Sequence, residues 1–238
     1  MDDIRLDNID FSVAILAGGK AKRFGGKIKS LLTIDGRPII EIIADSLSNL
    51  SNDLIVVTDK VDICRTLKSE VRCVKDLIPN RGPLSGLHAA LVTAENNPVF
   101  ICGGDMPFVK PYLVKRLYEI YIKRYIASGS LAMIPRYSVR YGVRYDVKYG
   151  VGNGFRKDVV CGEENDFIEP LFAFYSKELI RYLEDYMYRD SVFSLHDFIG
   201  SINCDFYDAS EDDIGIFTNI NTPGDYLRIK KSYKIILQ

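Results

Sequence analysis

The sequence has no excess of either charge and no long apolar run. Its 31 lysines and arginines nearly balance 32 aspartates and glutamates, so the net charge is −1. A chain so balanced has no long-range electrostatic field that favours nucleic acid. No apolar stretch approaches the roughly 20 residues that a transmembrane helix needs. We therefore expect neither a nucleic acid nor a membrane among the partners of this protein.

The start of the chain lacks the features of a secretory signal. Residues 1–7 are acidic and do not show the basic and then apolar order of a signal peptide. We therefore expect a cytoplasmic protein.

Cysteine and histidine are scarce. The five cysteines are scattered, odd in number and without any C-x-x-C spacing, and only two histidines are present. This pattern argues against a zinc site and favours reduced thiols in the core. The residues concerned are Cys64, Cys73, Cys102, Cys161, Cys204, His88 and His196.

The order of apolar segments predicts an α/β fold. Short apolar runs alternate with helical patterns, as they do in βαβ units, and strands of this kind form a mostly parallel, doubly wound sheet. The predicted strands cover residues 11–16, 54–58, 71–74, 98–102 and 170–175, and the predicted helices cover 38–47, 63–67, 85–95, 110–124, 176–188 and a last helix starting near 222. No linker divides the chain, so we expect a single domain over residues 1–238.

A glycine-rich basic loop follows the first predicted strand. Residues 18–29 contain four glycines and five cationic side chains. Glycine lets backbone N–H groups approach a phosphate, and lysine and arginine neutralise its charge. The loop matches neither the P-loop pattern nor G-x-G-x-x-G. It predicts a nucleoside triphosphate site, and the alternative is a solvated basic loop between strands.

Asp105 follows another buried strand and lies in the segment 102–108. Magnesium prefers carboxylate oxygen and usually keeps water and substrate phosphates as its other ligands. Ligands of open α/β sheets bind beyond the carboxyl ends of the strands, so Asp105 could face the basic loop there. The alternative is a turn-forming aspartate, given the neighbouring glycines and proline.

Residues 16–29 resemble the amino-terminal signature L-A-G-G-x-x-x-R-M-G-G-x-D-K of the molybdenum cofactor guanylyltransferases. The matching residues are Leu16, Ala17, Gly18, Gly19, Arg23, Gly25, Gly26 and Lys29. Phe24 replaces the usual methionine, an apolar exchange that we expect to be harmless. Ile28 replaces the usual aspartate, so a loop-ordering hydrogen bond from that carboxylate is not expected here.

Four later segments resemble the same family, in the same order along the chain. Residues 82–86 resemble its G-P-L-A-G loop, and residues 104–108 resemble its C-D-M-P-F segment, with Gly104 in place of the cysteine. We expect this last substitution to matter little. Residues 170–174 match a strand of the family, and residues 219–223 match its N-x-N-T-P segment.

The resemblance implies a Rossmann-like nucleotidyltransferase that transfers GMP from GTP to the phosphate of molybdopterin and releases pyrophosphate. It implies Mg²⁺ as cofactor, held by Asp105, with Arg23 and Lys29 stabilising the triphosphate and the leaving group. The nucleotide-binding residues it implies are Leu16, Ala17, Gly18, Gly19, Arg23, Lys29, Asp59, Asp76, Gly82, Asn219 and Asn221. GTP and molybdopterin are then the expected substrates, with molybdoenzyme apoproteins or other cofactor-biosynthesis proteins as further partners.

Asp76 is the residue that we expect to select guanine. Guanine presents N1–H and its exocyclic amino group side by side, and one carboxylate accepts from both, whereas cytosine offers no such pair. The family places an aspartate at this point before its G-P-L-A-G loop. The alternatives are a loop residue or a helix-start signal for Asp76, and helix caps for Asn219 and Asn221. Ser85 could likewise be a helix cap.

A tyrosine- and arginine-rich insertion is expected at about residues 136–165. Valine and tyrosine alternate there through a four-residue repeat between 138 and 151, which predicts a β-ribbon or hairpin. Three interpretations stay open: a solvated hairpin packed on its own domain, an edge for self-association, and a surface that stacks the pterin on tyrosines.

Three other functions are compatible with these residues. Transfer of CMP to molybdopterin and transfer of a nucleotide to a sugar phosphate would use the same fold. Asp76 and the Asn219/Asn221 pair favour guanine over cytosine. A nucleotide-binding cofactor carrier without catalysis is the third alternative, and the joint presence of Arg23, Lys29 and Asp105 argues against it.

Overall fold

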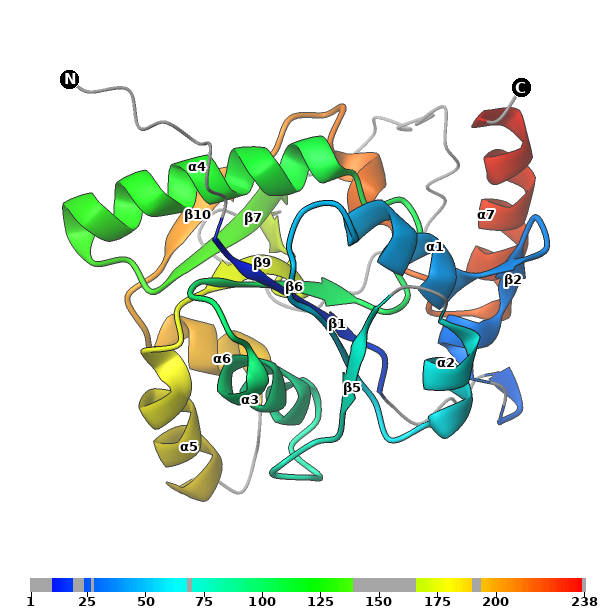
Figure 1. Ribbon diagram of the computed structural model, residues 1–238. Coiled ribbons are helices and arrows are strands. Elements are labelled where there is room, and N and C mark those ends of the chain that lie inside the picture. The colour runs from blue at the N-terminus through cyan, green and yellow to red at the C-terminus, as the bar shows by residue number, and fades with distance from the viewer. Residues whose placement is uncertain are drawn as a thin grey trace.

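The computed structural model describes residues 10–18, 24–26, 28–67, 70–138, 166–189 and 194–236 (Figure 1). The strands are β1 (Ser12–Leu16), β2 (Thr33–Ile34), β3 (Arg37–Pro38), β4 (Leu54–Val57), β5 (Arg72–Val74), β6 (Val99–Gly103), β7 (Ala132–Ser138), β8 (Asp166–Ile168), β9 (Phe172–Tyr175) and β10 (Asp205–Asp208). The helices are α1 (Ile39–Leu47), α2 (Val61–Thr66), α3 (Pro83–Thr93), α4 (Pro111–Ser128), α5 (Leu179–Arg189), α6 (Leu195–Gly200) and α7 (Pro223–Ile236), with short 3-10 helices η2 (Lys29–Leu31) and η3 (Ile214–Phe217).

One sheet runs through the centre of the molecule. Its strand order is β10-β7-β9-β6-β1-β4-β5, and β8 pairs with β7 outside this path. The pairs β6/β1, β1/β4, β4/β5 and β7/β10 are parallel, whereas β9 runs antiparallel to both β6 and β7. The predicted α/β fold with a mostly parallel sheet is confirmed.

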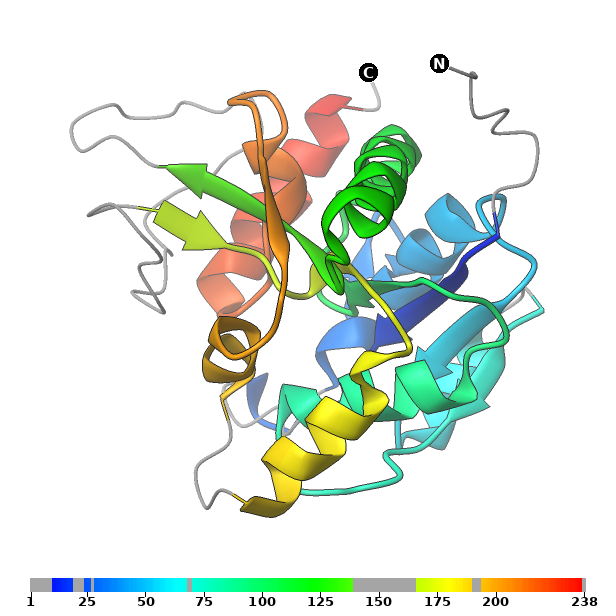
Figure 2. The same ribbon diagram turned by 90° about the vertical axis from the view of Figure 1, so that its left-hand side faces the viewer.

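Helices cover both faces of this sheet. In Figure 1, α4 and α1 lie above the sheet and α3, α5 and α6 lie below it, and Figure 2 shows the same two layers from the side. The apolar side chains of β1 alternate between them: Val13 and Ile15 pack with α1 and α4, and Ala14 packs with α3. All three are fully buried. A continuous apolar strand is therefore what a sheet covered on both faces requires.

A tight turn and a helix cap shape two short segments of the fold. Asp35 and Gly36 both have positive φ, at 49° and 79°, and join β2 to β3 in a tight hairpin. At the start of α7, the Asp225 N–H donates to Thr222 Oγ1 over 3.1 Å, and the Thr222 N–H donates to Asp225 Oδ2 over 2.7 Å. This reciprocal cap begins α7 at Pro223, in agreement with the last helix predicted to start near residue 222.

The cysteines correct one expectation. Cys64 on α2 and Cys73 on β5 form a disulfide, with their Cα atoms 6.2 Å apart, so the expectation of reduced thiols is wrong for this pair. The two residues are only nine positions apart in the chain, and α2 and β5 place them at the spacing that a disulfide needs. Cys102 is buried and Cys204 is half-buried, and neither takes part in a disulfide.

Two further expectations concern metals and membranes. Among the described residues, no three Cys, His, Asp or Glu side chains are grouped so that they could hold a metal ion. In the same part of the chain, we find no helix whose length and apolar character would let it cross a bilayer.

The predicted β-ribbon lies almost wholly outside the described residues. Residues 136–138, which we assigned to the start of the insertion, belong to β7. Arg136 and Tyr137 pair with β8, and Arg136 also pairs with β10. Of the predicted insertion, the structure therefore describes only the end of β7, and β8 begins at Asp166 directly after the predicted range.

Candidate active site

The carboxyl ends of β1, β4, β5 and β6 lie side by side at one edge of the sheet. The register aligns Leu16 of β1 with Val57 of β4 and with Gly103 of β6. The loops that follow these strands carry most of the residues that the sequence singled out. Parallel strands thus bring together side chains that are far apart in the chain, as expected for an open α/β sheet.

Lys29 and Asp105 meet at this edge. The Lys29 Nζ lies 2.5 Å from Asp105 Oδ2 and donates a second hydrogen bond over 3.0 Å to the carbonyl oxygen of Ile220. The Ile220 N–H donates in turn to the Asp105 carbonyl oxygen over 3.0 Å. Both charged side chains keep about a quarter of their surface exposed, at 29% and 22%. A cation and a carboxylate are therefore held together but remain accessible to a ligand.

Glu169 is a second acid at this site that the sequence interpretation missed. It lies in the turn between β8 and β9, and Phe172, at the start of β9, pairs with Cys102 near the end of β6. Burial, and then the negative charge of Asp105, raise the pKa of Glu169 to about 8, against the lowering effect of hydrogen bonds from Asn219 and the Leu171 N–H. Glu169 and Asp105 are thus neighbouring carboxyl groups, and the raised pKa favours the uncharged form of Glu169 at neutral pH.

Asn219 joins Glu169 to this group. Its Nδ2 donates to Glu169 Oε2 over 3.4 Å and to the Phe217 carbonyl oxygen over 3.3 Å. The alternative that Asn219 and Asn221 cap α7 is not supported, since Thr222 and Asp225 make the cap. For Asn221, the backbone N–H donates to Asp225 Oδ2 over 3.1 Å.

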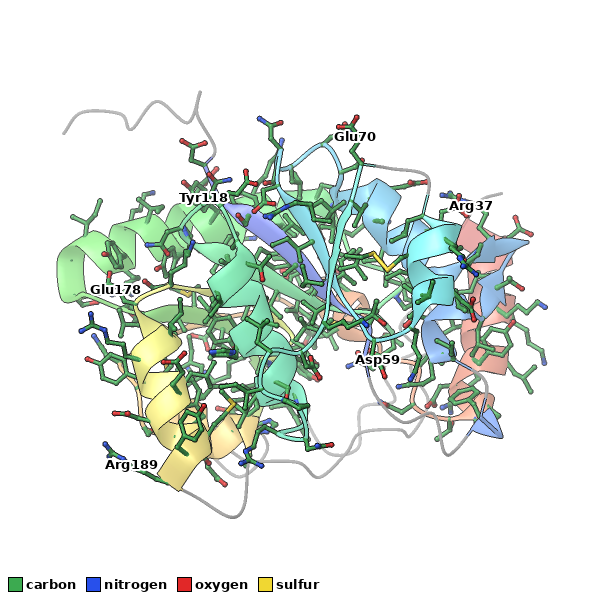
Figure 3. The ribbon with its side chains drawn as sticks, turned by 60° about the horizontal axis from the view of Figure 1, so that its bottom comes forward. Arg37, Asp59, Glu70, Tyr118, Glu178 and Arg189 are labelled. Carbon is green, nitrogen blue, oxygen red and sulfur yellow. A yellow bond between two sulfur atoms is a disulfide. The ribbon has the colours of Figure 1, made fainter. Side chains whose placement is uncertain are left out.

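Asp59 and Asp76 form a separate acidic pair at the ends of β4 and β5. Asp59 is 62% exposed and pairs with Lys60 over 2.8 Å, and this hydrogen bond lowers the pKa of Asp59. Figure 3 labels Asp59 near the end of β1. Partial burial raises the pKa of Asp76, and the charge of Asp59 adds to the increase. The structure thus groups Asp59 with Asp76, and it groups Lys29 with Asp105, without a contact between the two groups among the described residues.

Residues 16–18 lie between these two groups. The Leu16 carbonyl oxygen accepts from the Gly104 N–H over 2.9 Å, and the Ala17 N–H donates to the Val57 carbonyl oxygen over 3.0 Å. The backbone of the loop is thereby fixed to β4 on one side and to the segment after β6 on the other. Gly18 is exposed, with open space around it. Gly19 and Arg23 lie outside the described residues.

Gly104 corrects a second expectation. A Cβ atom at this position would lie 2.9 Å from the Ala17 Cα and 3.0 Å from the Leu16 carbonyl oxygen. Real Cβ atoms do not approach backbone atoms so closely. The absence of a side chain at Gly104 is therefore what allows Leu16 and Ala17 to pack against it. The expectation that glycine in place of cysteine matters little is wrong for this chain, because the loop after β1 packs directly on Gly104.

The start of α3 is also fixed by glycine. Gly82 has a φ of 60° and precedes Pro83, the first residue of the helix. Ser85 is buried inside the first turn, where its Oγ accepts from the Arg81 N–H over 3.0 Å, so it is not the cap. On the same helix, His88 is buried and lies 3.0 Å from Glu184 Oε1 of α5, which fits a packed helix residue.

Comparison with known proteins places the chain in a family. The family model of the MobA-like NTP transferase domain matches residues 13–199, well over half of the chain. The chain belongs to the MobA-like NTP transferase family. The predicted resemblance is thereby confirmed, and the protein is a nucleotidyltransferase.

Individual relatives of this NTP transferase agree. The chain is 28% identical over 233 residues to a probable molybdenum cofactor guanylyltransferase of Methanosarcina mazei, covering 90% of this chain and 87% of that protein. Molybdopterin-guanine dinucleotide biosynthesis protein A from Archaeoglobus fulgidus has a TM-score of 0.66 at 24% identity, covering 95% and 98% of the two chains. A 2-C-methyl-D-erythritol 4-phosphate cytidylyltransferase from Thermus thermophilus gives 0.63 at 17% identity, covering 94% and 99%. These two structures establish the fold and leave the choice of base open.

The donor atoms of this NTP transferase fit a magnesium ion. Asp105 supplies a carboxylate that keeps 22% of its surface exposed, and Asn219, which hydrogen-bonds to Glu169, supplies an amide oxygen. Magnesium needs only one or two protein carboxylates because water and substrate phosphates complete its octahedron. The absence of a larger acidic cluster among the described residues is therefore compatible with this ion.

Proposed function

We propose that this protein transfers GMP from GTP to the phosphate of molybdopterin in the cytoplasm. The observation that carries the proposal is the Lys29–Asp105 pair at the carboxyl edge of β1 and β6, in a chain of the MobA-like NTP transferase family. Relatives named molybdenum cofactor guanylyltransferases over most of their length support the choice of substrate.

The proposed reaction is an in-line nucleotidyl transfer. A phosphate oxygen of molybdopterin attacks the α-phosphorus of GTP, the bond from that phosphorus to the bridging oxygen of the β-phosphate breaks, and pyrophosphate leaves. No covalent intermediate with the protein is required, because positioning and electrostatic stabilisation suffice for such a transfer. GTP and molybdopterin are then the substrates, and a molybdoenzyme is a natural recipient of the product.

The residues of the edge would divide the work. Asp105 would hold Mg²⁺, which when bound supplies positive charge to the phosphate oxygens. Lys29, fixed by Asp105 and the Ile220 carbonyl oxygen, would neutralise charge on the triphosphate and the departing pyrophosphate. Arg23 would add a second cation from the glycine-rich loop.

The base would be selected on the other side of residues 16–18. The Asp76 carboxylate would accept from N1–H and the amino group of guanine, and Asp59 would lie beside it. Gly82 would permit close approach of the base or the ribose. In this arrangement Asp105 would serve the triphosphate through Mg²⁺, and the Asp59/Asp76 pair would serve the base.

A panel of GTP, CTP, ATP and UTP with Mg²⁺ tests the base. Selective binding stabilises the folded state, so GTP should raise the melting temperature more than the other three. Stabilisation by CTP but not by GTP would establish a cytidylyltransferase instead.

Pyrophosphate release tests the reaction. It should require GTP, Mg²⁺ and molybdopterin together. Binding of GTP without release under any of these conditions would favour the non-catalytic carrier, and release with a sugar phosphate in place of molybdopterin would identify the other transferase.

A further inference from the structure

We propose that Glu169 is a positioning residue that fixes the side-chain amide of Asn219, so that the Asn219 carbonyl oxygen is presented to the bound nucleotide. The inference rests on the proposed function only in taking this sheet edge as the nucleotide site. It concerns a residue that none of the matched sequence segments singled out.

The hydrogen bonds of Asn219 determine which way its amide points. A primary amide has two N–H donors, and both are directed at oxygen: one at Glu169 Oε2 over 3.4 Å and one at the Phe217 carbonyl over 3.3 Å. The flipped amide would place its own oxygen against the Phe217 carbonyl, which has no proton to donate, and that bond would be lost. Glu169 and the Phe217 carbonyl therefore hold the amide in this orientation together.

The orientation leaves an acceptor free. Among the residues that the structure describes, Oδ1 of Asn219 receives no hydrogen bond. The next residue, Ile220, contacts both members of the Lys29–Asp105 pair through its backbone. The free oxygen therefore lies within one residue of the groups proposed to bind the triphosphate, where it can accept from a hydroxyl of the nucleotide or ligate its cation.

Glu169 is itself held in place on three sides. Its N–H donates to the Pro135 carbonyl oxygen over 2.9 Å, and its carbonyl oxygen accepts from the Phe172 N–H over 3.0 Å. The Leu171 N–H donates to its carboxylate, and the Leu171 carbonyl oxygen accepts from the Gly103 N–H over 2.8 Å. A carboxylate locked to the end of β6 in this way can act as a fixed support for a binding residue.

A double-mutant cycle tests the inference through nucleotide binding alone. Glu169→Leu and Asn219→Ala should each weaken GTP binding about tenfold, the size of one lost hydrogen bond. The double variant E169L/N219A should also lose about tenfold and not about a hundredfold, because both changes remove the same interaction. Glu169→Gln should bind almost as the parent does, because its side-chain oxygen still accepts from Asn219.

Three controls keep the outcome interpretable. Each variant should melt, without nucleotide, within a few degrees of the parent, and Glu169→Ala replaces Glu169→Leu if the latter unfolds. Glu70→Leu is the matched control, since Glu70 is exposed and lies on another side of the molecule from Asp59 in Figure 3. GTP titrations with Mg²⁺ and with EDTA distinguish the two possible partners of Asn219 Oδ1. A loss of GTP affinity under both conditions points to a hydroxyl of the nucleotide. A loss of GTP affinity only with Mg²⁺ points to the cation.

Some results would overturn the inference. Unchanged binding in E169L, additive losses in the double variant, or a loss in E169Q as large as in E169L would each do so, the last because an accepting oxygen at this position would then not be enough. A parent protein that binds GTP without transferring GMP would contradict the proposed function and leave the cycle valid. If the parent prefers CTP, the same cycle is measured with CTP.

Discussion

Lys29 and Asp105 illustrate how a site is built from single residues of opposite charge. The carboxylate holds the lysine in the free protein, and both groups remain partly exposed. A ligand that brings its own phosphates and a divalent cation can therefore exchange partners with both. In the proposed reaction, turnover depends on Asp105 more than nucleotide binding does, since the loop and the Asp59/Asp76 pair would supply other contacts.

Asp105→Asn should therefore reduce turnover far more than affinity. We expect kcat to fall by at least about 100-fold, the effect of removing one electrostatic stabiliser of a transition state, whereas the Kd for GTP changes only a few-fold. Steady-state kinetics and calorimetric titration measure the two quantities. Asp45→Asn, at an exposed acid paired with Arg37, is the matched control. Full turnover in Asp105→Asn would refute the metal assignment.

Gly104→Ala should destabilise the protein and disturb the loop after β1. The new Cβ would press against the Ala17 Cα at 2.9 Å, so the backbone must shift, at a cost of about 1–3 kcal/mol in the free energy of unfolding. Urea denaturation measures this loss, and weaker GTP binding should accompany it. Gly200→Ala is the control, because a Cβ atom at Gly200 would have open space around it. This variant should change the free energy of unfolding by less than about 1 kcal/mol. Equal midpoints for the two variants would contradict the argument.

At the scale of elements, the disulfide ties α2 to β5 at one end of the sheet. Cys64 lies on the helix and Cys73 on the edge strand, and a yellow bond beside α2 marks a disulfide in Figure 3. In the part of the chain that the structure describes, β5 pairs with one strand, β4, through three residue pairs. A short edge strand has few backbone hydrogen bonds, so a covalent link to its neighbouring helix contributes to holding it.

Replacing both cysteines with serine should lower the free energy of unfolding by about 2–3 kcal/mol, the value expected for closing a loop of this length. Denaturation of the oxidised protein, the reduced protein and C64S/C73S measures it, and peptide mapping identifies the link. The reduced protein should behave like the double variant. Coincident unfolding curves for all three would show that the link contributes nothing to stability.

At the scale of the whole molecule, the two edges of the sheet have different roles. The carboxyl edge carries the groups that we propose to bind the nucleotide. The amino edge carries a buried network around Asp53, whose carboxylate accepts from Ser12, from Arg72 and from the Glu95 N–H. This network joins the starts of β1 and β5 to the segment before β6.

Acid should weaken this network. Burial tends to raise the pKa of Asp53, but hydrogen bonds from Glu95, Ser12 and Arg72, together with the charge of Arg72, outweigh it and lower the pKa below the usual 3.8. A carboxyl whose pKa is lowered by folding stabilises the protein above its unfolded pKa, and this contribution disappears as the pH falls through the folded pKa. Asp53→Asn should therefore destabilise strongly at pH 7 and progressively less below pH 3.8.

Urea denaturation of the parent and of Asp53→Asn across this pH range measures the difference. Asp185→Asn is the control, because its pair with Arg189 is exposed and such pairs contribute little. A stability difference for Asp53→Asn that does not shrink in acid would contradict the prediction. The kcat of Asp53→Asn should match that of the parent, because the network lies at the edge away from the site.

Much of the first half of the fold follows from local pattern. The predicted strands 11–16, 54–58, 71–74 and 98–102 match β1, β4, β5 and β6 within about one residue, and α1 follows Pro38 as expected. Helix ends were less predictable: α3 begins two residues before the expected start because Pro83 takes the first helical position. Residues 29–31 form a 3-10 turn. The strand β2 that follows covers only residues 33–34, although the apolar run extends over residues 31–34.

The second half depended more on pairing. β7, β8, β10 and α6 were not predicted, since their short and mixed sequences carry no clear period. Glu169 was missed for a related reason. It stands before β9, and only the antiparallel pairing of β9 with β6 brings that start to the edge where Asp105 lies. A rule based on residues that follow strands finds Asp105 and cannot find Glu169.

The sequence by itself determined the alternation of strands and helices, the basic glycine loop and the carboxylate after β6, because these depend on local period and residue chemistry. Tertiary structure alone decided which acids meet Lys29, that Gly104 has no room for a side chain, and that Cys64 reaches Cys73. Each of these depends on the direction of the segments that pair across the sheet and on the distance between them. No single stretch of the chain determines either of these.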